Sequence, residues 1–254
     1  MTVRELYEIL NEKIPPSLSC PWDNDGLMCC PDGARAVSRV LVALDVTDAV
    51  VHRATEEGYD LIVSHHPLIF KGLKAVNEES FIAAKAIDLI RNGISVMSFH
   101  TRLDALDGGV NDVLAARLGL CNAEPFGEEG IGRIGDLAEP MSAEQFAALV
   151  KQALGAPVVA LADAGRPVSR VAVLGGGGSD DADAAHAAGA DTYVTGELKY
   201  HQMVDAPEAG MNLIEAGHFY TEYPICEELR AMLLAIDPTL CVDVYTEGER
   251  VLYL

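Results

Sequence analysis

Short apolar runs alternate with longer amphipathic stretches along the first half of the chain. Residues 37–43, 61–64 and 94–99 are rich in branched apolar side chains, whereas apolar residues recur at three- and four-residue steps in residues 47–57 and 80–91. The first pattern is typical of buried strands and the second of helices that pack against a sheet. Because strands and helices alternate, we predict the α/β fold class.

Capping residues and glycines mark the elements that follow. Ser142 precedes an amphipathic stretch that carries Glu144 and Gln145 in its first turn, which is the signature of a helix start. The remaining pattern predicts helices over residues 1–11, 108–119, 142–154 and 223–235, a glycine-punctuated β-segment over 126–137, and a closing hairpin of 241–245 with 250–254. No low-complexity linker separates these elements, so we expect the two halves to be packed tightly and intertwined.

The second half of the chain resembles the first. Two pairs of segments match at an offset of 131 residues: Val37-Ser38-Arg39-Val40 with Val168-Ser169-Arg170-Val171, and Gly58-Tyr59-Asp60 with Gly189-Ala190-Asp191. Two copies with so long a period predict a duplicated α/β unit and not a solenoid. We therefore expect two α/β repeats, residues 1–125 and 126–254, of which the second lacks part of a loop and helix.

Histidines and carboxylates stand at the ends of the predicted strands. His100 lies four residues before Asp104, and His218 lies four residues before Glu222, each pair just after an apolar run. If each run passes into a helical turn, both side chains of a pair fall on one face. Imidazoles and carboxylates gathered at strand ends are the groups that a metal centre needs.

A third motif, Ser64-His65-His66-Pro67, also closes an apolar run. Neighbouring strand residues point to opposite faces, so both imidazoles can reach one centre only if the chain turns there. Pro67 favours an extended conformation for His66 and ends the run. Alone, the pair could be a polar strand end, but beside the two histidine–carboxylate motifs it indicates metal binding.

These motifs predict a centre for two divalent ions. The candidate ligands are His65, His66, Asp104, His218 and Glu222. Glu222 is long enough to bridge two ions, while His100 and His201 are candidates for orienting a ligand or a water. Mixed nitrogen and oxygen ligands suit zinc, manganese, iron, cobalt or nickel, and the sequence does not select one of them. Two such ions would activate a bridging water.

Further polar residues are candidates for catalysis or anion binding. By the repeat, His65 and His66 align with Gly196 and Glu197. Glu197 is therefore a candidate general base beside the same centre, with His100 and Glu222 as the other candidate catalytic groups. Three cations are candidates for anion binding: Arg102, Arg133 and Lys199.

Two turn-forming segments allow a second interpretation. The glycine loop at residues 175–178 could hold a phosphate on its N–H groups, but the acidic residues at positions 180, 181 and 183 would repel it, so we favour a simple turn. Asp23 and Asp25, beside Trp22, could approach the metals, but we interpret them as a solvated turn.

The composition limits the class of protein. The chain has 254 residues, half of them hydrophobic, and a formal net charge of −21, which argues against nonspecific nucleic-acid binding. The six cysteines lack zinc-ribbon spacing, so we expect thiols in a reducing compartment. No apolar run reaches the roughly 18 residues that span a bilayer, and residues 1–11 do not resemble a signal peptide. We therefore expect a cytoplasmic protein without a membrane partner.

Six motifs occur in the order found in one known family. They are Trp22-Asp23-Asn24-Asp25-Gly26-Leu27, Ser64-His65-His66-Pro67-Leu68-Ile69-Phe70, His100-Thr101-Arg102-Leu103-Asp104-Ala105, Gly130-Ile131-Gly132-Arg133-Ile134-Gly135, Thr195-Gly196-Glu197-Leu198-Lys199-Tyr200-His201 and Gly217-His218-Phe219-Tyr220-Thr221-Glu222. With them the chain resembles the NIF-three-like proteins, also called GTP cyclohydrolase I type 2 homologues, in their short form. Arg102, where the family usually has asparagine, and the acidic run after the glycine loop are departures that bear on substrate preference.

The resemblance implies two interleaved α/β repeats with mixed sheets and a metal pair between them. It places the metal ligands on the same five residues, His65, His66, Asp104, His218 and Glu222. It also implies a homohexameric ring, built as a trimer of dimers, whose sites face an internal cavity. The activity it implies is conversion of GTP to a dihydroneopterin triphosphate.

The sequence thus favours a metal-dependent hydrolase that acts on a nucleotide or a related anionic small molecule. Attack by metal-activated water is the expected mechanism. The alternative is a non-catalytic protein that binds or delivers metal or serves as a scaffold, since the ligands alone do not distinguish these functions.

Overall fold

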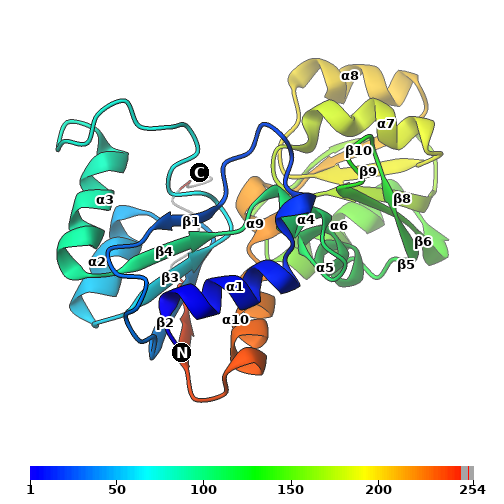
Figure 1. Ribbon diagram of the computed structural model, residues 1–254. Helices are drawn as coiled ribbons and strands as arrows, with labels where there is room; N and C mark the ends of the chain where they lie inside the picture. The colour runs from blue at the N-terminus through cyan, green and yellow to red at the C-terminus, as the bar shows by residue number, and fades with distance from the viewer. Residues whose placement is uncertain (247–250, 252–254) are drawn as a thin grey trace. The chain divides into compact units, whose positions relative to one another are not determined.

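The chain forms two mixed sheets, each in its own unit of the computed structural model, which describes residues 1–246 and residue 251 (Figure 1). Unit 1 comprises Met1–Leu103 and the segment that begins at Ile225, and unit 2 comprises Asp104–Pro224. The units do not coincide with the expected repeats, 1–125 and 126–254, because the chain enters unit 2 at Asp104 and returns to unit 1 at Ile225.

Unit 1 contains a five-stranded sheet in the order β1-β4-β3-β2-β11. Its strands are β1 (Gly26–Cys29), β2 (Arg39–Ala43), β3 (Leu61–Ser64), β4 (Ser95–Ser98) and β11 (Cys241–Val244). All neighbours are parallel except β1, which runs antiparallel to β4. Every residue of β3 and β4 is buried, as expected for parallel strands covered on both faces.

The four long helices of unit 1 begin one or two residues after the predicted starts. They are α1 (Val3–Lys13), α2 (Asp48–Glu56), α3 (Phe81–Asn92) and α10 (Ile225–Ile236), and the unit also contains the first residues of α4 (Thr101–Ala105) and a 3₁₀ turn η1 (Pro16–Leu18). Thr47 and Ser80 are N-caps whose hydroxyls accept hydrogen bonds from the first turns of α2 and α3. Among the described residues, no helix is long and apolar enough to cross a membrane.

Unit 2 contains a six-stranded sheet in the order β5-β6-β8-β9-β10-β7. Its strands are β5 (Cys121–Phe126), β6 (Gly132–Met141), β7 (Ala160–Ala162), β8 (Val168–Leu174), β9 (Thr192–Thr195) and β10 (Asn212–Glu215). Its helices are α5 (Val110–Arg117), α6 (Ala143–Leu154), α7 (Ala182–Ala187), α8 (Tyr200–Glu208) and α9 (His218–Glu222), with a 3₁₀ turn η2 (Gly178–Asp181). The expected β-segment at 126–137 is therefore the end of one strand and most of a longer one.

The duplication is confirmed by matching hydrogen bonds in the two sheets. The Asp60 carboxylate accepts the backbone N–H groups of Ser38 and Arg39, and the Asp191 carboxylate accepts those of Ser169 and Arg170. Strands β2, β3 and β4 are parallel in unit 1, as are β8, β9 and β10 in unit 2. An antiparallel strand closes each set, β1 on β4 and β7 on β10.

The two repeats are interleaved because each gives its last helix to the other unit. Helix α5 follows α4 in the first repeat but packs against β6 and β8 in unit 2. Helix α10 follows α9 in the second repeat but packs against β2 and β11 in unit 1. Strand β11 pairs in parallel with β2, whereas the second arm of the expected hairpin lies outside the described residues apart from residue 251.

Candidate metal centre

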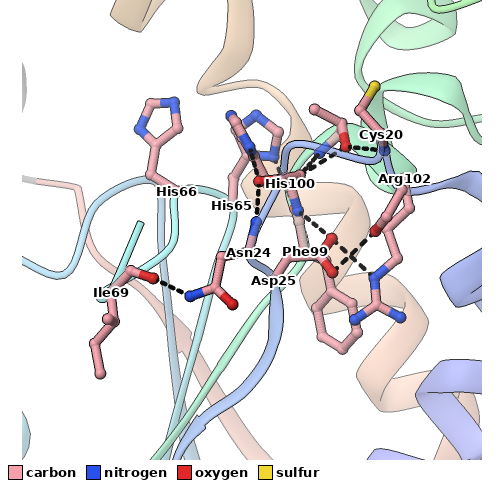
Figure 2. Close-up of polar contacts among 12 residues, drawn as sticks. Cys20, Asn24, Asp25, His65, His66, Ile69, Phe99, His100 and Arg102 are labelled. Atoms are coloured by element: carbon pink, nitrogen blue, oxygen red, sulfur yellow. Dashed lines mark hydrogen bonds and ion pairs between the residues drawn. The ribbon is translucent and has the colours of Figure 1, made fainter. Parts of the chain in front are cut away.

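Three imidazoles meet at one edge of the sheet of unit 1. His65 and His66 follow β3, and His100 follows the neighbouring parallel strand β4, so all three stand at the carboxyl ends of adjacent strands. Their ring nitrogens include a set that lies within 4.8 Å of one another. The ring centroid of His65 is 5.0 Å from that of His66 and 5.3 Å from that of His100 (Figure 2).

A tight turn brings the rings of His65 and His66 to the same place. The hydroxyl of Ser64 donates to the carbonyl of His66 at 2.8 Å, which closes a bend directly after β3. The backbone N–H of His66 donates to the carbonyl of Leu44 at 2.9 Å. The turn that the two adjacent histidines required is therefore present.

Each of the three imidazoles is oriented through Nδ1 by an oxygen. His65 Nδ1 lies 2.9 Å from the carbonyl oxygen of Phe99, and His66 Nδ1 lies 2.8 Å from a carboxylate oxygen of Asp45. His100 Nδ1 lies 2.9 Å from a carboxylate oxygen of Asp23. Because a carbonyl and an ionised carboxylate only accept, these contacts favour the tautomer with the proton on Nδ1 and the lone pair on Nε2. Metal-binding histidines usually show this arrangement.

The carboxylates of Asp23 and Asp25 are buried, although Trp22 and Asn24 in the same turn are exposed. The Asp23 side chain is 0% exposed. Besides His100, it accepts the N–H and the hydroxyl of Thr101 at 3.0 and 2.6 Å. Asp25 accepts the N–H of His100 and Nε of Arg102. The solvated-turn interpretation is wrong because these carboxylates satisfy the start of α4 from a distant segment of the chain.

The hydrogen bonds around Asp23 also fix its charge. Burial by itself raises the pKa of this carboxyl group. The hydrogen bonds from His100 and Thr101 outweigh burial and hold the pKa of Asp23 well below its usual range. His100 is therefore held by an ionised carboxylate.

Unit 2 carries a second group of candidate ligands on α9. His218 and Glu222 lie one helical turn apart, and His218 Nε2 is 3.1 Å from a carboxylate oxygen of Glu222. His218 Nδ1 is 2.7 Å from a carboxylate oxygen of Glu197. The Glu222 side chain is buried, whereas that of Glu197 is exposed. Glu197, a candidate general base by its sequence position, lies where it orients His218.

The glycine loop makes room for the His218–Glu222 pair. Gly176 has a φ of +67°, and a Cβ atom there would lie 2.0 Å from Oε1 of Glu222 and 2.9 Å from Nε2 of His218. The backbone N–H of Gly176 donates to the hydroxyl of Thr221, and that of Gly175 donates to Asn111. Because these two N–H groups already donate to side chains of the protein, the structure agrees with the prediction of a simple turn.

Asp104 lies on α4, one helical turn after His100, and is half-buried. Its own carbonyl accepts a hydrogen bond from the side chain of Asn111. The chain passes from unit 1 to unit 2 at this residue.

The cations that were candidates for anion binding have other partners. Arg102 is buried and donates to Asp25 and Asn11. Arg133 is buried and donates to Asp112. Lys199 is exposed and pairs with Asp180 at the acidic run, so each of the three cations has a carboxylate partner.

His201 is exposed on α8 and lines a small pocket beside α7. Asp45, which sequence analysis missed, follows β2 and orients His66. Its position just after an apolar strand was the available signal.

Comparison with known proteins agrees with the fold and the motifs. The model of the Duf34/NIF3 (NGG1p interacting factor 3) family matches residues 1–246. The chain belongs to this family. A GTP cyclohydrolase 1 type 2 homolog from Clostridium perfringens is 34% identical over 232 residues, which cover 89% of this chain and 88% of that protein.

Two solved structures share the fold over the whole chain. The crystal structure of the Staphylococcus aureus hypothetical protein SA1388 is similar with a TM-score of 0.91 and 30% identity, covering 100% of this chain and 99% of that one. A Bacillus cereus protein related to NIF3 has the same fold, with a TM-score of 0.87, 24% identity and the same coverage of both chains.

The donor sets of this NIF3 protein fit a divalent metal ion. Two donors that bind one ion at about 2.0–2.1 Å in a tetrahedral or octahedral arrangement lie about 3 Å apart. The 3.1 Å between His218 Nε2 and the Glu222 carboxylate matches that separation. The cluster of His65, His66 and His100 offers nitrogen donors of the same kind. The histidine and carboxylate groups of this chain can therefore hold metal.

Proposed function

We propose that the chain is a dinuclear metal-dependent hydrolase of a nucleotide or a related anionic small molecule. The proposed ligands are His65, His66, Asp104, His218 and Glu222. The observation that carries the proposal is that the imidazoles of His65, His66, His100 and His218 are all oriented through Nδ1 by oxygen atoms. In the three histidines that are proposed ligands, that arrangement prepares Nε2 for a metal before the metal binds.

Neither group of ligands is complete within its own unit. The histidine cluster of unit 1 contains no carboxylate, whereas a centre that holds two ions usually has a carboxylate long enough to bridge them. Glu222 has the reach to bridge, and Asp104 lies on α4, which begins directly after His100. We therefore propose that both repeats contribute ligands to one centre. The large net charge of −21 does not oppose an anionic substrate there, because two divalent ions reverse the local field.

Two divalent ions, when bound, supply Lewis acidity and lower the pKa of an attacking water. His100 can accept the proton of that water at Nε2, because its Nδ1 proton is shared with the Asp23 carboxylate. Asp23 then stabilises the imidazolium that forms. Glu197 keeps the ring of His218 in place through Nδ1. Since relatives carry the name GTP cyclohydrolase 1 type 2 homolog, GTP is the first substrate to test.

To test this proposal, the purified protein is loaded separately with zinc, manganese, iron, cobalt and nickel. The bound metal and the turnover of GTP are then measured for each metal. Glu222→Gln should lose metal and turnover together, whereas Glu228→Gln, at an exposed position of α10, should change neither. Full metal content in Glu222→Gln would contradict the ligand assignment.

The alternative function is metal delivery without catalysis. It is favoured by the side-chain exposure of His66 and His218, 22% and 35%, which leaves room for a competing ligand. Metal transfer to a chelator or an acceptor protein, with no turnover of nucleotides or phosphoesters in any metal form, would identify this function. Turnover that Asp104→Ala abolishes would exclude it.

A further inference from the structure

Two exposed aromatic rings stand beside the histidine cluster of unit 1. The side chains of Trp22 and Phe70 are large and apolar, yet 58% and 42% of their residue surfaces are exposed. The ring centroid of His100 lies 6.3 Å from that of Trp22 and 6.0 Å from that of Phe70. An apolar surface next to convergent polar groups is the usual composition of a small-molecule site.

The loops that carry these rings are fixed at their bases. Trp22 directly precedes Asp23, which is hydrogen-bonded to His100 and Thr101. The side-chain amide of Asn24 donates to the carbonyl of Ile69, the residue before Phe70, and so ties the two loops together (Figure 2). The rings therefore lie on ordered segments, and binding a ligand there would require little further ordering.

The loop with Phe70 is specific to the first repeat. Residues 65–80 connect β3 to α3 without a helix or strand, whereas β9 and α8, at the matching place in the second repeat, are joined by only a few residues. Connections of this length without regular structure are uncommon in compact domains, and those that are ordered usually carry function. Lys71 and Lys74 follow Phe70 in the same loop and are exposed, so it also brings positive charge to a strongly acidic chain.

The rings of Trp22 and Phe70 form an edge-to-face pair. Their centroids are 6.3 Å apart and their planes meet at 72°, so they do not stack face to face. A planar ring can stack on one of them and meet the edge of the other, which are both favourable geometries for aromatic pairs. Nucleobases stack on tryptophan and phenylalanine in this way with little dependence on their identity.

We propose that Trp22 and Phe70 bind the planar heteroaromatic ring of the substrate, such as a nucleobase, while its anionic part lies at the metal centre. This inference rests on the proposed function. It assigns the two rings to substrate binding, where they would contribute a factor on the order of 10 to 100 in affinity. Covering of the pair by a second copy of the chain is the competing explanation.

Trp22 is the only tryptophan in the sequence, so the fluorescence of the whole protein reports on this site. We would titrate the metal-loaded protein with GTP, with guanosine and with inorganic triphosphate, exciting at the red edge of tryptophan absorption where guanine absorbs little. GTP and guanosine should quench Trp22, and triphosphate, which lacks a ring, should not. Quenching by triphosphate to the same extent as by GTP would overturn the assignment.

Phe70→Ala should weaken GTP binding about 10-fold while the bound metal stays unchanged, and Phe70→Tyr should restore it. The matched control is Phe81→Ala, since Phe81 is even more exposed but lies at the start of α3. Equal affinity in Phe70→Ala and Phe81→Ala would overturn the proposal.

The same measurements separate this proposal from the proposed function. If metal binds and GTP is hydrolysed but guanosine leaves the fluorescence unchanged, the aromatic site is refuted and the hydrolase stands. If no metal binds but guanosine still quenches, the ring site stands and the metal centre is refuted. If Trp22 resists iodide quenching and Phe70→Ala lowers the oligomeric mass, a second copy covers the pair and the proposal fails.

Discussion

The carboxylate of Asp23 holds Nδ1 of His100 at 2.9 Å, although the two residues are separated by most of the first repeat. The same carboxylate also accepts both donors of Thr101, the first residue of α4. One buried side chain therefore sets the direction of an imidazole and the start of the helix that carries Asp104.

Asp23→Asn keeps the size of the side chain but removes the charge that fixes the tautomer of His100. We expect turnover to fall on the order of 100-fold, with metal content retained because His100 is not among the proposed ligands. Steady-state kinetics and elemental analysis of the same samples test this, with Asp88→Asn on the exposed surface of α3 as the control. Loss of metal in proportion to activity would instead show that His100 or α4 serves metal binding.

Glu197→Gln should weaken metal binding by roughly 10- to 100-fold, because Glu197 orients His218 and makes its ring more basic. The prediction is tested by competition with a chromophoric chelator. Glu197 is exposed, so the unfolding midpoint should change little. Turnover that is lost at saturating metal would favour the general-base role that the sequence suggested.

Gly176→Ala should disrupt the pair formed by His218 and Glu222, because its Cβ would overlap Oε1 of Glu222 and because its φ of +67° disfavours any other residue. Gly177→Ala is the matched control, since nothing lies within 4 Å of a Cβ atom at the next position. We expect reduced metal content only in the first variant, measured on protein with an unchanged circular dichroism spectrum. Equal metal content in both would show that Glu222 can move aside.

Asp60 anchors the first sheet and makes its stability depend on pH. Burial raises the pKa of Asp60, but hydrogen bonds from the N–H groups of Arg39 and Ser38 and from Arg35 outweigh it and lower the pKa. A lowered pKa in the folded state gives stability that is complete above the unfolded value of about 3.9 and is lost as the pH falls further.

Asp60→Asn should therefore lower the free energy of unfolding by about 1–3 kcal/mol at neutral pH, and the difference from the unchanged protein should shrink below about pH 4. Urea titrations at both pH values measure it. A difference in the free energy of unfolding that does not change with pH would mean that the charge of Asp60 does not contribute to stability.

The sequence was sufficient to predict features that depend on residues close together along the chain. The apolar runs at β3 and β4 predicted buried strands, and Ser142 predicted a helix start because a capping hydroxyl acts within three residues. All six cysteines are free thiols, as expected.

Features that depend on contacts between distant segments could not be predicted from the sequence. Asp23 looked like part of a solvated turn because its partners, His100 and Thr101, are remote in sequence. Arg102 looked like a substrate contact for the same reason, since Asp25 and Asn11 are distant too. The five proposed metal ligands follow from their motifs, and their joint action stays a prediction.

The exchange of α5 and α10 between the two sheets bears on how such a chain arose. In a polypeptide with only one repeat, the final helix would not pack on the sheet of that repeat. That sheet would then lack one of the helices that pack against it. Such a molecule could complete both structures by trading helices with a second identical molecule, which is a domain-swapped dimer. Fusion of the two gene copies would then have joined the two halves of this reversible dimer permanently in one chain. The halves would afterwards have been free to diverge, so that one has two adjacent histidines where the other has glycine and glutamate.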